Sequence, residues 1–451
     1  METTTGERAA TAKKKASTVR HTRAIQRDRQ TRPTVAPSAP AVEARLAELI
    51  HPATLAQVAT FRALGLRARV LTLPVMVAFV LSLVWRHLGA VAEATRVLRG
   101  EGLLWAAPVA VSQQAVSARL RRFPAALFER VLAEVLPQAA ARWRARQRPL
   151  PPALAWARHH FAAVLILDGS TLDALLHKVG LLREERGPLL AGRIAALLDL
   201  LSELPRQLWY TEDPHASDQG FWDEASAAVP PGALLLFDLG FLNYARFDTL
   251  TEREVCFLTR AGAKMAYQVE RVLQATSERR DRIVTVGAHP AHRCRHRLRL
   301  VERWHRGRWY RYLTNVLDPQ RLPLDYAVAL YWQRWRVEDA FLAVKRLLGL
   351  AYFWTGAVNG VLTQVWATWL LYAALVDLTD AVAEVLDRPF QDLSLEMVYR
   401  GLYHFTQAFH RGEADDPVAY LAANAAWLGL LTRHRRDSPA TLLALTFADG
   451  P

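Results

Sequence analysis

Four polar side chains between positions 331 and 345 have a spacing that places them on one face of a helix. They are Tyr331, Arg334, Glu338 and Lys345. At about 100° per residue they fall within one narrow sector, and an apolar stripe that includes Phe341 borders it. Burying Glu338 costs free energy unless a cation or metal compensates it. Two interpretations therefore remain open, a chemical site and a structural ion-pair network with Arg334 and Lys345.

Two short apolar runs each end in an aspartate. Residues 161–167 (FAAVLIL) lead to Asp168, and residues 233–237 (ALLLF) lead to Asp238. Continuous apolar runs of this length predict buried strands, so each aspartate would emerge at the carboxyl end of a strand. A salt-bridge network would explain Glu338 but not these two aspartates.

The three carboxylates together predict a site for two divalent cations. Hard oxygen ligands suit Mg²⁺, and Mn²⁺ is possible. Such a pair of ions would activate a water or a 3′ hydroxyl for in-line attack on a phosphodiester. We expect Asp168, Asp238 and Glu338 to be both the metal ligands and the catalytic residues.

The segments that must position this site differ in composition. Residues 1–40 lack an apolar period and predict a disordered basic tail, whereas residues 41–150 are helical in pattern throughout. Within them, Ser112 could cap a basic helix ending at Arg121 and Arg122, in a helix-turn-helix-like element. Short basic helices are common without DNA, so a DNA-binding role and a solvated helix both remain open.

A strongly basic stretch with alternating residues precedes the polar helix. Residues 297–304 and 308–314 predict a hairpin across HisArgGly. Arginines interleave with aromatic rings here, which suits a nucleic-acid strand held by its backbone and stacked at its bases, although a solvated sheet face is the alternative. The candidate DNA contacts in this stretch are Arg297, Arg299, Trp304 and Trp309.

Composition restricts the partner and the compartment. A net charge of +14, from 57 Lys and Arg against 43 Asp and Glu, favours a polyanion over an anionic membrane surface. Two cysteines make no disulfide framework and no four-thiol zinc site, which suits a reducing cytoplasm. The apolar runs at 70–85 and 361–375 are short or interrupted, so we interpret both as core helices rather than membrane spans.

These motifs resemble the DDE transposases of bacterial insertion sequences, specifically the insertion-sequence-four family with its YREK signature. The signature positions have the family's spacing of two, three and six intervening residues. The resemblance extends to AspGlySerThr at Asp168, AspLeuGlyPhe at Asp238 and LeuThrAsn at 313–315, and covers about residues 110 to 380. One departure is Leu239, where many relatives have arginine.

The resemblance implies an α/β fold with a ribonuclease-H-like catalytic core, a β-rich insertion, an N-terminal helical domain and a C-terminal helical region. The implied division is a tail at 1–40, a helical DNA-binding domain at 41–150, core segments at 151–256 and 313–385 around an insertion at 257–312, and a C-terminal region at 386–451.

The implied activity is metal-dependent strand cleavage and strand transfer at the terminal inverted repeats of an insertion sequence, by a homodimer on paired DNA ends. The alternative is a transposase-derived DNA-binding protein or nuclease without strand transfer. Tyr331, Arg334 and Lys345 would hold DNA phosphates, with pairing to Glu338 still possible when no DNA is bound. Trp304 or Trp309 could stack a flipped base.

Overall fold

The computed structural model describes residues 39–432, except 87, 89–90, 173–191, 214, 242, 263, 288–292 and 350–357. The expected disordered tail at 1–40 and the last residues of the C-terminal region lie almost wholly outside the described residues.

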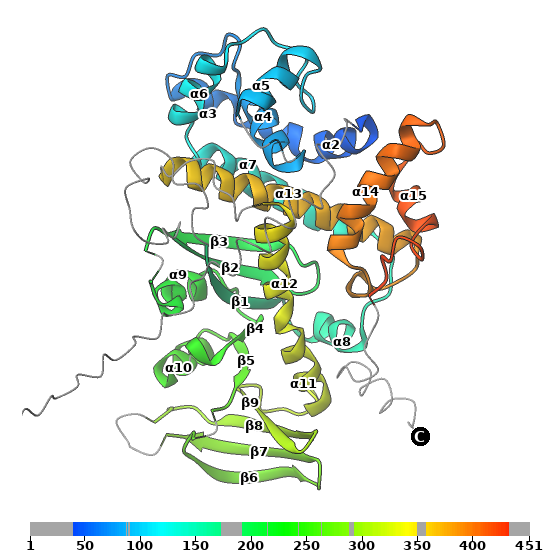
Figure 1. Ribbon diagram of the computed structural model, residues 1–451. Helices are drawn as coiled ribbons and strands as arrows, with labels where there is room; N and C mark the ends of the chain where they lie inside the picture. Colours follow the sequence, from blue (N-terminus) through cyan, green and yellow to red (C-terminus); the bar gives the residue numbers. More distant parts are fainter. Residues whose placement is uncertain are drawn as a thin grey trace, which may run out of the picture.

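A mixed sheet forms the middle of the molecule (Figure 1). In the described residues it has nine strands in the order β3-β2-β1-β4-β5-β9-β8-β7-β6. Strands β1, β4 and β5 run parallel to one another, and the remaining neighbours pair antiparallel. The strands are β1 Val164–Thr171, β2 Arg193–Asp199, β3 Pro205–Thr211, β4 Leu234–Phe237, β5 Cys256–Arg260, β6 Tyr267–Ala275, β7 Arg279–Val286, β8 Leu298–His305 and β9 Arg308–Thr314.

Alternation along the central strands divides the core into two layers. In β1, Leu165 and Leu167 belong to one buried cluster, while Val164 and Ile166 belong to the other. Successive strand residues point to opposite faces, so a run that is apolar throughout can be buried on both. The continuous apolar pattern of residues 161–167 therefore correctly predicts a doubly covered strand.

Short helices cover one face of the sheet and longer ones the other. On the first face, α9 and α10 contribute Trp222 and Phe247 to the cluster under β1 and β4. The segments between β3 and β5 are η2 Asp218–Phe221, α9 Trp222–Ala227, η3 Leu239–Phe241 and α10 Tyr244–Glu252.

The polar signature lies in a helical rod on the second face (Figure 1). The sequence predicts that the signature lies on one regular helix. This prediction is wrong in detail, because the backbone tightens into a 3₁₀ turn at Arg334 and widens into a π-helical turn at Lys345. Irregular turns of this kind inside helices often occur at functional positions. The rod consists of α11 Leu324–Trp332, η5 Gln333–Trp335, α12 Arg336–Leu342 and the π-helical η6 Ala343–Leu347.

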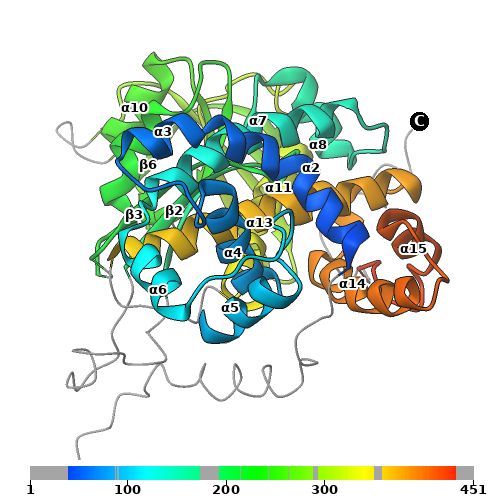
Figure 2. The ribbon, with the colours of Figure 1, turned by 90° about the horizontal axis from the view of Figure 1, so that it is seen from above.

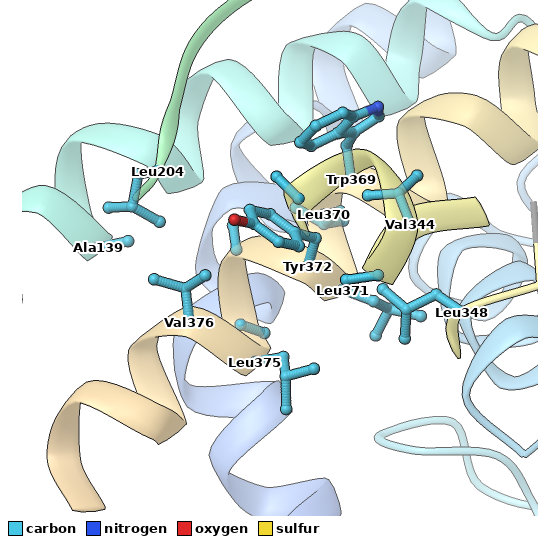
Figure 3. Packing of buried hydrophobic residues seen from close by; sticks show 14 of the residues in the cluster. Ala139, Leu204, Val344, Leu348, Trp369, Leu370, Leu371, Tyr372, Leu375 and Val376 are labelled. Atoms are coloured by element: carbon cyan, nitrogen blue, oxygen red, sulfur yellow. The ribbon is translucent and has the colours of Figure 1, made fainter. Parts of the chain in front are cut away.

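Helix α13 joins the second face of the sheet to the N-terminal helices (Figures 1 and 2). Its Trp369 and Tyr372 lie among Val344 of η6, Ala139 of α7 and Leu204 at the edge of the sheet (Figure 3). The remaining helices are α2 Pro40–Ala56, α3 Val58–Ala63, α4 Leu73–Trp85, α5 Val91–Gly100, α6 Gln113–Arg122, α7 Ala126–Ala145, α8 Pro152–His160, α13 Val358–Val385, η7 Phe390–Asp392, α14 Leu395–His410 and α15 Pro417–Ala423.

Both apolar runs form interior helices, as predicted. Helix α4 begins beside Pro74, and its Thr72 side chain accepts a hydrogen bond from the Val75 amide. Among the described residues, α13 is the one helix whose length and hydropathy would allow a membrane crossing, but 94% of its most apolar window is buried inside the protein. Burial on all sides accounts for its apolar composition.

Candidate active site

The two aspartates follow equivalent positions on neighbouring parallel strands. The register pairs Leu167 of β1 with Phe237 of β4, so Asp168 and Asp238 are the next residues on each strand. Thr259 of β5 fixes the end of β4, because its hydroxyl donates to the Phe237 carbonyl over 2.9 Å. The two aspartates therefore lie at equivalent positions of neighbouring strands, but only Asp238 follows the end of its strand as predicted, because β1 continues through Asp168 to Thr171.

Arg334 joins the first strand to the signature helix. Its Nη1 lies 2.8 Å from Oδ2 of Asp168, and its Nη2 lies 3.3 Å from Oε1 of Glu338. The guanidinium is buried, whereas the Glu338 side chain is 44% exposed. Three carboxylates influence this cation, because Asp238 also lies near enough to favour its charged form.

Burial and the nearby positive charge shift the pKa values of the carboxyl groups in this cluster in opposite directions. Burial raises the pKa of Asp168 to about 6, although Arg334 and the Gly169 amide both oppose that rise. Burial also raises the pKa of Glu338, again against Arg334. For Arg334, burial works against the charged form, but the carboxylates outweigh it and raise its pKa. The guanidinium therefore stays charged, and it limits the rise in the pKa of Asp168 and Glu338.

Tyr331 faces Asp238 from α11. Its hydroxyl donates to Oδ1 of Asp238 over 3.4 Å, and its ring lies 4.9 Å from that of Tyr312 on β9. Burial raises the pKa of Tyr331 well above its ordinary value, which keeps the hydroxyl protonated as a donor. In the structure Tyr331 thus orients a carboxylate, and its predicted phosphate contact stays a prediction.

Lys345 lies at the other end of the signature. Its Nζ donates to the hydroxyl of Ser170 over 2.7 Å and to the carbonyl of Thr171. The residue therefore ties the π-helical turn to the end of β1, immediately after Asp168.

The donor set suits a hard divalent cation, but a guanidinium already lies within it. Asp168, Asp238 and Glu338 offer only carboxylate oxygens, the ligands that Mg²⁺ and Mn²⁺ prefer. In the described residues, no three carboxyl, imidazole or thiol groups are grouped closely enough to hold a metal ion together. The residues fit the metal chemically, and Arg334 compensates the carboxylates in its place.

A fourth carboxylate was missed by the sequence reasoning. Asp218 begins η2 and forms an ion pair with Arg193 of β2, with Nη2 2.6 Å from Oδ1. A side chain at Gly169 would place its Cβ 1.8 Å from the same Oδ1, so Asp218 lies directly over the backbone next to Asp168. Its charge also raises the pKa of Asp168. In the sequence, the feature that marks this position is Ser217, which caps η2. A helix cap predicts local structure but not the contact of Asp218 with a distant strand.

The prediction for Arg299 is wrong. It was predicted to contact DNA, but it is fully buried and its guanidinium binds Asp281 of β7 over 2.7 and 2.6 Å. It also donates to the Leu322 carbonyl, 2.7 Å away. The buried ion pair with Asp281 holds Arg299 in the core, so its role is structural. Arg297, two residues earlier, is exposed and pairs with Glu270 of β6 at 2.7 Å.

The two tryptophans of the hairpin lie opposite one another at its tip. Trp304 and Trp309 are register partners with ring centroids 5.5 Å apart. The Arg280 guanidinium covers the Trp309 ring at 4.0 Å, whereas Trp304 is 38% exposed. Trp304 is therefore the more available of the two for stacking.

A pocket of about 470 Å³ lies between the hairpin and the signature helix. It is lined by His305, Arg306, Arg308, Tyr310 and Trp332. The rings of Tyr310 and Trp332 have centroids 5.6 Å apart. The sequence does not identify Trp332 as a functional residue, because Trp332 is not one of the four signature positions, whereas its neighbour Tyr331 is.

The N-terminal basic helix forms as predicted, with its Ser112 cap. The hydroxyl accepts a hydrogen bond from the Ala115 amide over 3.2 Å. Helix α6 contacts α5, but residues 101–112 separate them, a much longer connection than the short turn of a helix-turn-helix. Arg121 and Arg122 are exposed. A role in DNA binding stays a prediction.

Comparison with known proteins places a family match over this site. Residues 161–372 match the family described as the transposase DDE domain, which supports a DDE transposase. No curated protein matches the chain. Among solved structures, the chain is similar to a piggyBac transposase in a synaptic complex with hairpin DNA, at 11% identity, covering 87% of this chain and 84% of that one, with a TM-score of 0.39. A TM-score of this size does not establish a shared fold.

Proposed function

We propose that this chain is a DNA transposase that cleaves and joins DNA strands at the terminal inverted repeats of an insertion sequence. The observation that carries the proposal is the meeting of Asp168, Asp238 and Glu338 around Arg334, within the segment that matches the transposase DDE domain. Carboxylates from two parallel strands and one helix form the donor set that phosphodiester chemistry uses.

The strand order supports a ribonuclease-H-like core. Its first five strands lie in the order β3-β2-β1-β4-β5, with β1, β4 and β5 parallel and β2 and β3 antiparallel to their neighbours. Strands β6 to β9 continue the same sheet through the β5–β9 pair, which is consistent with an insertion before the glutamate. We further propose membership of the insertion-sequence-four group and the domain division given above.

The three carboxylates would hold two Mg²⁺ ions, with Mn²⁺ as a possible substitute. Bound metal would supply the charge that activates the attacking oxygen and stabilises the leaving one. The chain's own residues orient these ligands. Tyr331 donates to Asp238, Lys345 fixes the strand end after Asp168, and Thr259 fixes β4.

The DNA-binding part of the proposal depends on charge and aromatic rings. A net charge of +14 attracts a polyanion. The pocket between Tyr310 and Trp332 joins flat rings to the cations Arg306 and Arg308, a combination that suits an unstacked nucleotide. We propose that a base flipped during hairpin formation enters this pocket, with Trp304 beside it, and that the protein acts as a homodimer on paired ends.

The test is a cleavage assay with Mg²⁺ and DNA carrying the repeats that flank the gene. Wild type should nick and join at the repeat ends, while Asp168→Asn, Asp238→Asn and Glu338→Gln should each reduce both products to background yet still bind the DNA. If wild type binds the repeats without nicking them, the chain is a transposase-derived DNA-binding protein. Products that survive all three substitutions would exclude this carboxylate site.

A further inference from the structure

We propose that Arg334 is a built-in counter-ion that occupies the metal-binding carboxylates of the resting enzyme and competes with the divalent cation for them. The inference rests on the proposed function, because it assigns a second role to a residue of the same site. Its consequence is that metal binding releases Arg334, which then becomes available to a DNA phosphate.

Arg334 bridges two carboxylates rather than pairing with one. Its two terminal nitrogens contact different carboxylates, Asp168 at 2.8 Å and Glu338 at 3.3 Å. The two belong to different elements, β1 and α12, so the guanidinium joins β1 to α12 across the site. A planar fork suits this bridging, which a lysine ammonium could not reproduce with the same geometry.

One atom of the guanidinium is not satisfied in this arrangement. The Nε of Arg334 is buried and has no hydrogen-bond partner. A buried donor without a partner costs free energy, and such groups are rare in native proteins. The resting arrangement therefore leaves part of the bonding capacity of Arg334 unused, as expected of a residue that has another arrangement with a ligand.

Other cations around the site have different contacts. Lys345 donates to Ser170 and Thr171, and Arg193 pairs with Asp218. Arg336, two residues after Arg334, lies 3.6 Å from Glu203 and donates to the Gln391 carbonyl. Arg334 is thus the cation whose hydrogen bonds use the oxygens of Asp168 and Glu338 that a metal would need.

Competition follows from charge and from shared lone pairs. A divalent cation bound to Asp168 and Glu338 takes the oxygens that now accept from Arg334, and its charge repels the guanidinium. The 3₁₀ turn that carries Arg334 lies between α11 and α12 and is a place where the helix backbone can adjust. Because the guanidinium and the metal compete for the same oxygens, a change that weakens the hold of Arg334 must tighten metal binding.

The experiment is a Mn²⁺ titration of the full-length, DNA-free protein, followed by electron paramagnetic resonance of free Mn²⁺. Arg334→Gln should bind Mn²⁺ roughly 5- to 100-fold more tightly than wild type. Arg336→Gln is the matched control, because it removes the same charge from the next turn but does not touch the triad. Its Mn²⁺ affinity should stay close to that of wild type.

A second measurement covers the case in which Arg334→Gln folds poorly. In thermal unfolding, Arg334→Lys keeps the charge but loses the fork, so it should be less stable than wild type without metal and gain more from added Mn²⁺. Unchanged or weaker Mn²⁺ binding by Arg334→Gln, or equal tightening by Arg336→Gln, would overturn the inference. If wild-type Mn²⁺ binding is unaffected by Asp168→Asn and Asp238→Asn, the proposed metal site itself fails instead.

Discussion

Position 169 requires glycine because of a close contact across the site, not because of its own backbone conformation. A Cβ there would lie 1.8 Å from Oδ1 of Asp218, which Arg193 holds in place. The ion pair therefore cannot simply move aside. The glycine of the AspGlySerThr motif lets a second acidic side chain lie directly beside Asp168.

Gly169→Ala should destabilise the fold by about 1–3 kcal/mol, because an inserted methyl must displace a paired side chain. It should also reduce nicking by disturbing Asp168. Urea unfolding and the cleavage assay measure the two effects. Gly220→Ala is the control, since nothing lies within 4 Å of its Cβ position and it occupies the same segment as Asp218. Equal stability of the two variants would contradict the steric account.

Glu203 is a buried carboxyl between the sheet and the helices. It lies in the turn between β2 and β3, and its carbonyl accepts a hydrogen bond from the Tyr372 hydroxyl of α13 over 3.0 Å. Burial raises the pKa of its side chain from 4.5 to about 7, although Arg336 lowers it. The folded protein therefore holds this proton more tightly than the unfolded chain does.

This difference predicts a pH dependence of stability. The stabilisation from the bound proton is fully present below about pH 4.5 and is lost as pH rises through about 7, so the contribution of Glu203 falls by on the order of 3 kcal/mol across that window. Glu203→Gln should flatten this part of the profile and be more stable than wild type at pH 8. The check is urea unfolding at pH 5 and pH 8; identical pH slopes for both proteins would refute it.

At the scale of elements, the rod of α11, η5, α12 and η6 connects the carboxylates to the hairpin. Tyr331 faces Asp238, while its neighbour Trp332 donates its Nε1 proton to the Tyr312 hydroxyl over 2.9 Å. One helical end therefore contacts both the Asp238 carboxylate and the aromatic pocket. Cleavage and the handling of an unpaired base would depend on the same short segment.

Trp332→Ala should reduce formation of a DNA hairpin more than first-strand nicking, because it removes one wall of the pocket but no carboxylate contact. Trp304→Ala should act in the same direction more weakly, since Trp304 stands outside the pocket lining. Gel analysis of end-labelled repeat DNA separates the two products. Trp427→Ala, at an exposed position of the C-terminal region, is the control and should leave both unchanged. Equal loss of both steps in Trp332→Ala would argue against base stacking.

At the scale of the whole molecule, buried ion pairs fasten the N-terminal helices to the core. Arg146, directly after α7, contacts Asp377 at 2.8 Å and Asp380 at 2.9 Å on α13, and Arg148 pairs with Asp380 as well. Asp380 is almost completely buried. These contacts fix where the N-terminal helices leave the core, and hence the placement of any DNA bound by α6.

Asp380→Ala should destabilise the protein by about 3–5 kcal/mol, since it removes the ion-pair partner of the buried Arg148 and one of the partners of Arg146. Glu396→Ala, which breaks an exposed pair with Arg400 on α14, should have little effect. Thermal unfolding compares the two. A small effect of Asp380→Ala would mean that apolar packing of α7 on α13 is sufficient to hold the two parts together.

The sequence by itself determined the apolar strands that lead to Asp168 and Asp238, the helical signature and the core helices, because each depends on local periodicity. It could not determine the burial of Arg299, since Arg299 and Arg303 lie on the same face of β8 and only the contact with Asp281 distinguishes the buried one. Nor could it place Asp218 over Gly169, Trp332 in the pocket or Arg334 between Asp168 and Glu338. Those contacts join residues from different elements, so only the tertiary structure decided them.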